Sequence, residues 1–191
     1  MILLAALILG LLAGLAAARW QGVPYQAPQF RHIWLLPVSM LPQLAAVYGP
    51  AREAPRAAPS AAVLLMLSLL GFAAFAWLNR RFPGMAVLLI GLVLNMAVMA
   101  ANGGWMPISP EIARHLPGGR PAEAALLGAR ADDKSVLMRP EDTRLEFLAD
   151  RFLIPEVAGY RAAVSLGDML IAVGAFWLLA APASRPKPNM E

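Results

Sequence analysis

Five long apolar runs govern what this chain of 191 residues can fold into. They cover residues 1–18, 33–48, 61–78, 84–101 and 162–181. A helix needs about 17–25 apolar residues to cross the hydrocarbon core of a bilayer, and four runs meet this length. The chain is 59% hydrophobic and 15% charged, unlike a soluble domain. The sequence therefore predicts an all-α, polytopic membrane bundle of about five spans.

The first two runs each leave an alternative open. Residues 33–48 are few and contain Pro37 and Pro42, which a span tolerates when neighbouring helices satisfy the freed carbonyls. We interpret them as a kinked span, and the alternative is a re-entrant or interfacial segment. Residues 16–18 resemble a signal-peptide cleavage site, but no positive charge precedes the apolar stretch. We therefore expect the first run to be retained as a span.

The positions of Lys and Arg predict the orientation. If the N-terminus faces outward, the inner connections and tail collect Arg19, Arg31, Arg80, Arg81, Arg185 and Lys187. The positive-inside rule then places the N-terminus outside and the C-terminus inside a cytoplasmic membrane. The net charge of +4 reflects this anchoring, so we expect no nucleic-acid partner.

The expected organisation has four parts. Residues 1–101 form the first four helices, 102–160 an extracytoplasmic loop, 161–182 the fifth helix and 183–191 a cytoplasmic tail. In the loop, residues 135–138 predict a short extended run. Thr143 and Glu146 have capping-box spacing, and Leu145, Leu148, Ala149 and Phe152 follow with helical periodicity. This pattern predicts a short amphipathic helix, in a loop that either simply covers the bundle or closes over a substrate.

The start of the loop predicts a sharp exit from the fourth helix. Gly103 and Gly104 suit backbone with positive φ, and Pro107 prevents the helix from resuming. Trp105 is expected to anchor at the membrane interface.

Asp168 is an ionisable residue seven positions into the last apolar run, where a charge is costly. Asn95 lies at a matching depth on the preceding span, about 9 Å below the outer boundary. We expect these two side chains to hydrogen-bond, with Ser165 one turn away and Asn102 above. The four residues, with Asp150 as a further candidate, predict a polar ligand-binding pocket that opens outward. Interhelical hydrogen bonding without a ligand is the alternative.

The sequence contains few residues that could form a catalytic or metal-binding site. The chain has no cysteine, and His32 and His115 fall on opposite faces of the membrane under this topology. We therefore expect no catalytic residue, metal or cofactor. The stretch ending at Asp168 resembles an intramembrane aspartyl-protease motif, but that chemistry needs a second carboxylate, which the other spans lack. An extracytoplasmic hydrolase using Asp150 or His115 has only scattered residues behind it.

Small residues recur where helices are expected to pack. Gly10 and Gly14 form a GxxxG pair, and Gly167 and Gly174 share one face of the last span. Such faces allow helices to approach closely. Beyond the lipid bilayer, the expected partners are other membrane proteins or a second copy of this chain.

Several motifs occur together along most of the chain. They are Asn95, Asn-Arg-Arg-Phe-Pro-Gly at 79–84, Asn-Gly-Gly-Trp-Met-Pro at 102–107, Thr-Arg-Leu at 143–145, Phe-Leu-Ala-Asp at 147–150 and Ser-Leu-Gly-Asp at 165–168. In combination they resemble a bacterial membrane family, domain of unknown function 5317. Ala149 departs from the glycine expected there. The resemblance implies a helical bundle with this polar cluster in a bacterial cytoplasmic membrane. It does not indicate a particular activity.

Two functional classes therefore remain. The first is a small non-catalytic membrane protein that acts as an accessory, scaffold or assembly subunit of a complex. The second binds or transports a small amphiphile, a cation or a proton at the pocket around Asp168.

Overall fold

A computed structural model describes residues 2–50, 58–116, 127–157 and 160–181. The fold is mostly helical. Its long helices are α1 (Ile2–Trp20), α2 (Leu35–Tyr48), α3 (Pro59–Leu78), α4 (Met85–Ala101) and α6 (Leu166–Ala180). Between α4 and α6 lies a segment of short elements, which we call the cap and define as the described residues from 102 to 165.

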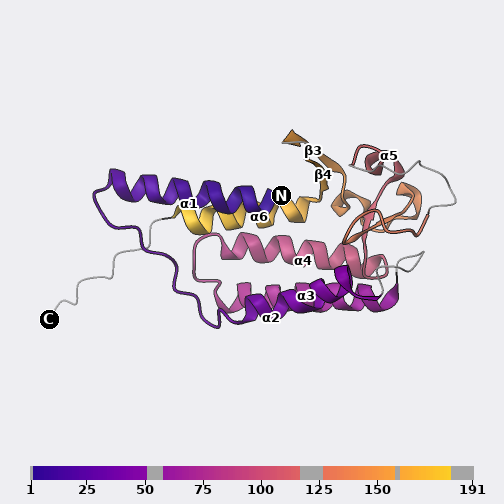
Figure 1. Ribbon diagram of the computed structural model, residues 1–191, viewed down its shortest axis with the longest axis horizontal. Coiled ribbons are helices and arrows are strands. Elements are labelled where there is room, and N and C mark those ends of the chain that lie inside the picture. Colours follow the sequence, from indigo (N-terminus) through magenta and orange to yellow (C-terminus); the bar gives the residue numbers. More distant parts are fainter. Residues whose placement is uncertain (1, 51–57, 117–126, 158–159, 182–191) are drawn as a thin grey trace.

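The long helices form a row. α1 packs on α6, α6 on α4, α4 on α3, and α3 on α2, so α1 and α2 lie at the two ends of the row. Figure 1 shows α1 beside α6, with α4 next to them and α2 and α3 beyond. Consecutive long helices run in opposite directions, and the cap sits at the end where α4 finishes and α6 begins.

Glycines set the closest helix contacts. A Cβ added to Gly10 would lie 2.6 Å from the carbonyl oxygen of Phe176, and one added to Gly91 would lie 2.5 Å from that of Gly167. The backbones of α1 and α4 therefore touch α6 directly. Small-residue faces pack helices within the chain as predicted, and the GxxxG face of α1 is occupied by α6.

In the described part of the chain, two helices, α1 and α3, are long and apolar enough to cross a membrane. The helices α2, α4 and α6 are also apolar but shorter, with 14, 17 and 15 residues. The fifth helix, predicted at 161–182, starts later than expected. Residues up to Val164 form a strand, and α6 begins at Leu166.

The end of the row opposite the cap is tied together by Asn79. Its side chain accepts a hydrogen bond from Arg31 N at 2.8 Å and donates to the carbonyls of Arg31 and Phe75. Nearby, Phe30 packs edge-on against Phe75 and Phe82. These contacts fix the connection between α1 and α2 against α3.

The cap begins as the sequence predicts. Gly103 and Gly104 have φ of 74° and 85° and turn the chain out of α4. Strand β1 (Met106–Ile108) then pairs in parallel with β2 (Ser135–Leu137), which confirms the predicted extended run. Between them, α5 (Pro110–Ala113) is a single helical turn.

The amphipathic helix predicted in the cap is wrong. The chain forms two 3₁₀ turns, η3 (Pro140–Asp142) and η4 (Glu146–Leu148), followed by an antiparallel hairpin of β3 (Phe152–Val157) and β4 (Tyr160–Val164). The Thr143 hydroxyl donates to the carbonyl of Arg139. It does not act as a helix cap, in which the hydroxyl would accept from a backbone N–H. Leu145 has a positive φ of 55°, and this left-handed conformation interrupts a helix.

Trp105 is not the expected interfacial anchor. It is buried, with 4% of its surface exposed, and the Arg130 guanidinium lies 4.9 Å from its ring centroid. Arg130 also donates to the carbonyl of Ala46 near the end of α2. Trp105 therefore helps to hold the cap on the helices.

Candidate functional site

Asp168 lies in the first turn of α6. Its backbone N–H donates to Ser165 Oγ at 3.0 Å, and Ser165 N donates to Asp168 Oδ2 at 3.4 Å. This reciprocal arrangement is a capping box, and the positive end of a helix dipole favours a carboxylate there. Asp168 is thus placed at a helix start, not deep inside one.

Asn95 joins α4 to this turn. Its amide nitrogen donates to Asp168 Oδ1 at 2.7 Å, and its amide oxygen accepts from the Ser165 hydroxyl at 2.8 Å. The hydrogen bond predicted between Asn95 and Asp168 is therefore present, with Ser165 bonded to both partners.

Lys134 is the central residue of the site, and the sequence analysis missed it. Its Nζ lies 2.6 Å from Asp168 Oδ2 and 3.5 Å from Asp150 Oδ2. Asp150 also accepts a hydrogen bond from the Ser135 hydroxyl at 3.0 Å. We call the six residues the Lys134 cluster: Asn95, Lys134, Ser135, Asp150, Ser165 and Asp168.

The backbone around Lys134 explains how the cap presents it. The Asp132 carboxylate accepts from the backbone N–H groups of Lys134 and Ser135, a local turn typical of aspartate. The Lys134 carbonyl accepts from Met106 N as β1 and β2 begin to pair. The short sheet thereby fixes the lysine over the start of α6.

The Lys134 cluster contains more acidic than basic side chains. Burial raises the pKa of Asp150 to about 6, although the ammonium of Lys134 pulls it down. Burial works against the charge on Lys134, but Asp150 and Asp168 outweigh it and raise the pKa of the lysine above its ordinary value. Two carboxylates therefore face one ammonium near neutral pH.

Asn102 does not belong to the cluster, contrary to expectation. Its amide nitrogen donates to the carbonyls of Val98 and Arg144, and its oxygen accepts from Arg144 N. Asn102 therefore fastens the cap to the end of α4. The other four predicted residues, Asn95, Ser165, Asp168 and Asp150, lie together in the Lys134 cluster, and their binding of a ligand stays a prediction.

A groove of about 430 Å³ runs along the helices from the Lys134 cluster. All five long helices contribute apolar side chains, among them Leu7, Leu36, Leu69, Leu92 and Ile171. Asn95, Lys134 and Asp168 provide its polar lining, together with Gln43 on α2. The volume lies within the range of about 300–1,000 Å³ typical of ligand sites. We call this cavity the five-helix groove.

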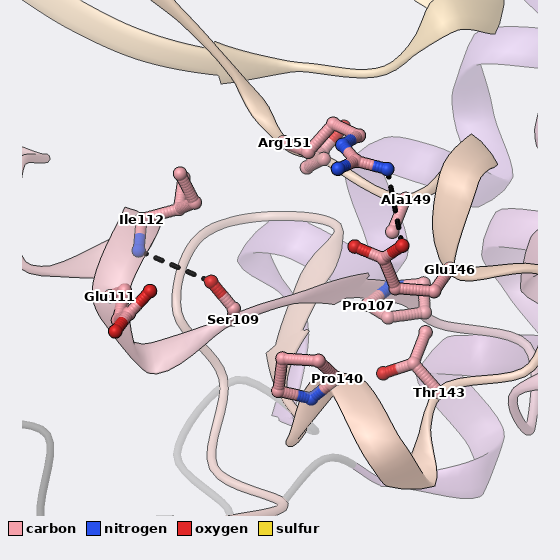
Figure 2. A pocket seen from close by; sticks show the side chains of 10 residues that line it. Pro107, Ser109, Glu111, Ile112, Pro140, Thr143, Glu146, Ala149 and Arg151 are labelled. Carbon is pink, nitrogen blue, oxygen red and sulfur yellow. Dashed lines mark hydrogen bonds and ion pairs between the residues drawn. The ribbon is translucent and has the colours of Figure 1, made fainter.

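The cap also has a smaller pocket of about 190 Å³, whose lining includes Asp150 of the cluster. Figure 2 shows the side chains that line it, including the ion pair between Arg151 and Glu146 and the bond from Ile112 N to Ser109 Oγ. The ion pair is well exposed and therefore contributes little to stability. Across the described part of the chain, no three His, Asp or Glu residues are grouped to hold a metal ion.

Comparison with known proteins places the chain in a family. Residues 28–180 match the family of unknown function DUF5317. The chain belongs to the DUF5317 family. This confirms the resemblance seen in the sequence, and the matched region contains the whole Lys134 cluster and every long helix except α1.

One relative of the chain is an uncharacterized protein of Thermotoga maritima. It is 31% identical over 105 residues, and the match covers 55% of each chain. The chain therefore matches about half the length of this relative. No solved structure matches the chain.

Proposed function

We propose that this protein spans a bacterial cytoplasmic membrane with its five long helices and binds an amphiphile in the five-helix groove. The carrying observation is that one apolar cavity, lined by every long helix, ends at the charged pair of Lys134 and Asp168. The apolar tail lies along the helices, and the polar head meets the cluster beneath the cap.

The exposed surface of the helices supports the membrane assignment. Only 22% of the apolar window of α1 and 33% of that of α3 is buried within the chain, whereas a core helix of a soluble protein is mostly buried. Leu4, Ile8 and Leu12 on α1 are each more than half exposed. Soluble proteins rarely expose a continuous apolar surface of this extent, so lipid is the fitting neighbour.

The charge distribution supports the orientation. Arg19 ends α1, Arg31 precedes α2, and Arg80 and Arg81 lie between α3 and α4. All four lie at the end of the row opposite the cap. The positive-inside rule then puts the cap and the Lys134 cluster on the outer side.

The arrangement of the row supports access from the bilayer. α1 and α2 lie at its two ends, yet both line the groove, through Leu3 and Leu7 on one side and Leu36 and Gln43 on the other. Because helices from both ends of the row line the groove, we expect it to open between α1 and α2, on the side that faces lipid in the proposed membrane arrangement. Because lipid tails are as apolar as the groove, the head at the cluster decides specificity.

The competing proposal is an accessory or scaffold subunit, in which the cluster only fastens the cap to α4 and α6. One observation favours it. Among the described residues, every buried side-chain nitrogen or oxygen has at least one hydrogen-bond partner, so the cluster holds together without a ligand. Both proposals explain why the residues are charged, and they differ in what the groove contains.

A pair of adjacent substitutions on α3 separates the two. Leu69 lines the groove, whereas Leu70 is about half exposed on the outer surface of the helix. Lipid that copurifies with the protein in mild detergent is counted by native mass spectrometry. We expect Leu69→Trp to lose bound lipid and Leu70→Trp to retain it at equal abundance. If the unaltered protein carries and takes up no lipid, the amphiphile proposal fails and the scaffold proposal stands.

A further inference from the structure

We propose that the five-helix groove selects amphiphiles with an uncharged hydroxyl or carbonyl head over those with an anionic or cationic head. This rests on the proposed function, because it names the class of ligand for the same groove. The argument comes from which charges of the Lys134 cluster a ligand can touch and which it cannot.

The charges that a ligand can touch balance one another. The side chain of Lys134 is 32% exposed and that of Asp168 is 18% exposed, and both residues line the groove. Their side chains are 2.6 Å apart, so they form a neutral pair. A neutral pair offers no net attraction to a charged head.

The charge that a ligand cannot touch sets the preference against anions. Asp150 has a fully buried side chain behind Lys134, at 3.5 Å from its Nζ. A phosphate, sulfate or carboxylate head bound to Lys134 would face two carboxylates in a poorly solvated place. Like charges interact strongly when water is excluded, so such a head is disfavoured.

Cations are disfavoured for a different reason. The more exposed member of the accessible pair is Lys134, so a cationic head entering the polar end meets an ammonium. At Asp168 the ammonium at 2.6 Å, the Asn95 amide at 2.7 Å and Ser165 N already fill three of about four acceptor positions. A cation therefore finds at most one position, beside the ammonium of Lys134, and is disfavoured there.

The remaining hydrogen-bonding capacity fits an uncharged head. An ammonium has three N–H donors, and Lys134 uses one on Asp168 and one on Asp150. The Asp168 carboxylate has about four acceptor positions, of which Asn95, Lys134 and Ser165 N occupy three. One N–H donor of Lys134 and one acceptor position on Asp168 Oδ1 are left. A hydroxyl uses both, and a ketone or quinone carbonyl uses the donor.

The test compares four probes that share one long alkyl chain: an alcohol, a methyl ketone, a sulfate and a trimethylammonium. Each competes with radiolabelled alcohol for the full-length protein in nanodiscs of phosphatidylcholine. We expect the affinity for the alcohol to be at least about tenfold higher than for the sulfate or the trimethylammonium. The affinity for the ketone should lie in between.

Substitution of the buried charge tests the cause. Asp150→Asn keeps the shape of the side chain, so we expect sulfate binding to strengthen more than alcohol binding, and the discrimination between the two probes to shrink about tenfold. Asp142→Asn makes the same charge change at an exposed position of the cap and should leave both unchanged. If Asp150→Asn does not fold, Lys134→Gln replaces it, and it should turn the preference toward the trimethylammonium.

The outcomes separate this inference from the proposed function. Tighter binding of the sulfate or the trimethylammonium than of the alcohol overturns the inference and leaves groove binding in place. Unchanged discrimination in both cluster variants also overturns it. Failure of every probe to bind overturns the proposed function itself.

Discussion

The ammonium of Lys134 lies 2.6 Å from the carboxylate of Asp168, across a sequence separation of 34 residues. One residue comes from the cap and the other from the first turn of α6. Asn95 bonds the same carboxylate from α4. A single aspartate therefore joins the cap to two helices, and changes to its partners should weaken that junction.

Loss of the lysine should destabilise the cap. Lys134→Met leaves Asp150 and Asp168 without a counter-ion, and we expect a loss on the order of 2 kcal/mol, less than for a fully buried pair. The free energy of unfolding is measured in detergent by urea titration. Arg151→Met is the control, because it breaks the exposed pair with Glu146 and should cost under about 1 kcal/mol. Equal losses in the two variants would contradict the assigned role of Lys134.

Asn95 should be intolerant of an apolar replacement of similar size. Asn95→Leu leaves the Asp168 carboxylate and the Ser165 hydroxyl each short of a partner, which costs about 1–3 kcal/mol. A double-mutant cycle with Ser165→Ala measures how much of this loss comes from the Ser165 bond. Strictly additive losses would show that the two side chains do not interact.

Stability should depend on pH through Asp150. Its pKa is raised from 3.8 to about 6 in the folded state, so the folded protein binds this proton more tightly than the unfolded chain. The resulting stabilisation is full below about pH 4 and is lost as the pH rises through about 6. The difference in unfolding free energy between the unaltered protein and Asp150→Asn should therefore change across this window. A constant difference from pH 4 to 7 would rule out the raised pKa.

The glycine contacts predict a contrast between two substitutions. Gly91→Ala would place a methyl group 2.5 Å from the Gly167 carbonyl oxygen, so α4 and α6 must separate, at a cost of about 1–3 kcal/mol. Gly103→Ala meets no atom within 4 Å and should cost only the strain of its positive φ, about 1 kcal/mol. Thermal unfolding in detergent ranks the two. A larger loss at Gly103 would contradict the close contact between the helices.

The orientation can be tested with single cysteines, because the chain has none. Glu141→Cys lies on the exposed surface of the cap, and Gln21→Cys directly follows α1, whose C-terminal end is opposite the cap. A membrane-impermeant maleimide applied to intact cells should label only the first, and both after permeabilisation. Labelling of Gln21→Cys in intact cells would overturn the proposed topology.

Sequence reasoning found Asn95, Ser165, Asp168 and, in the loop, Asp150, but it missed Lys134 and Ser135 for a physical reason. Asn95, Ser165 and Asp168 stand out because polar groups are costly in apolar runs. Lys134 follows two aspartates in a charged stretch, so it has the pattern of a solvated turn, and its fold depends on a pairing of β1 with β2 that no local signal reveals. The clue available was charge balance, since a buried aspartate needs a cation.

The cap also shows where local patterns lose to tertiary contacts. Thr143 and Glu146 have the spacing of a capping box, but Glu146 pairs with Arg151 and Leu145 adopts a left-handed conformation. Trp105 has the position of an interfacial anchor, but Arg130 covers it against the helices. Periodicity describes one segment at a time, and these residues are held by others far along the chain.

The contact of α1 with α6 has a consequence for biosynthesis. Of the five long helices described, α1 is made first and α6, which packs against Gly10 and Gly14, is made last. Until α6 is made, the GxxxG face of α1 lacks the helix that covers it. A chain cut short before α6 would keep that face exposed.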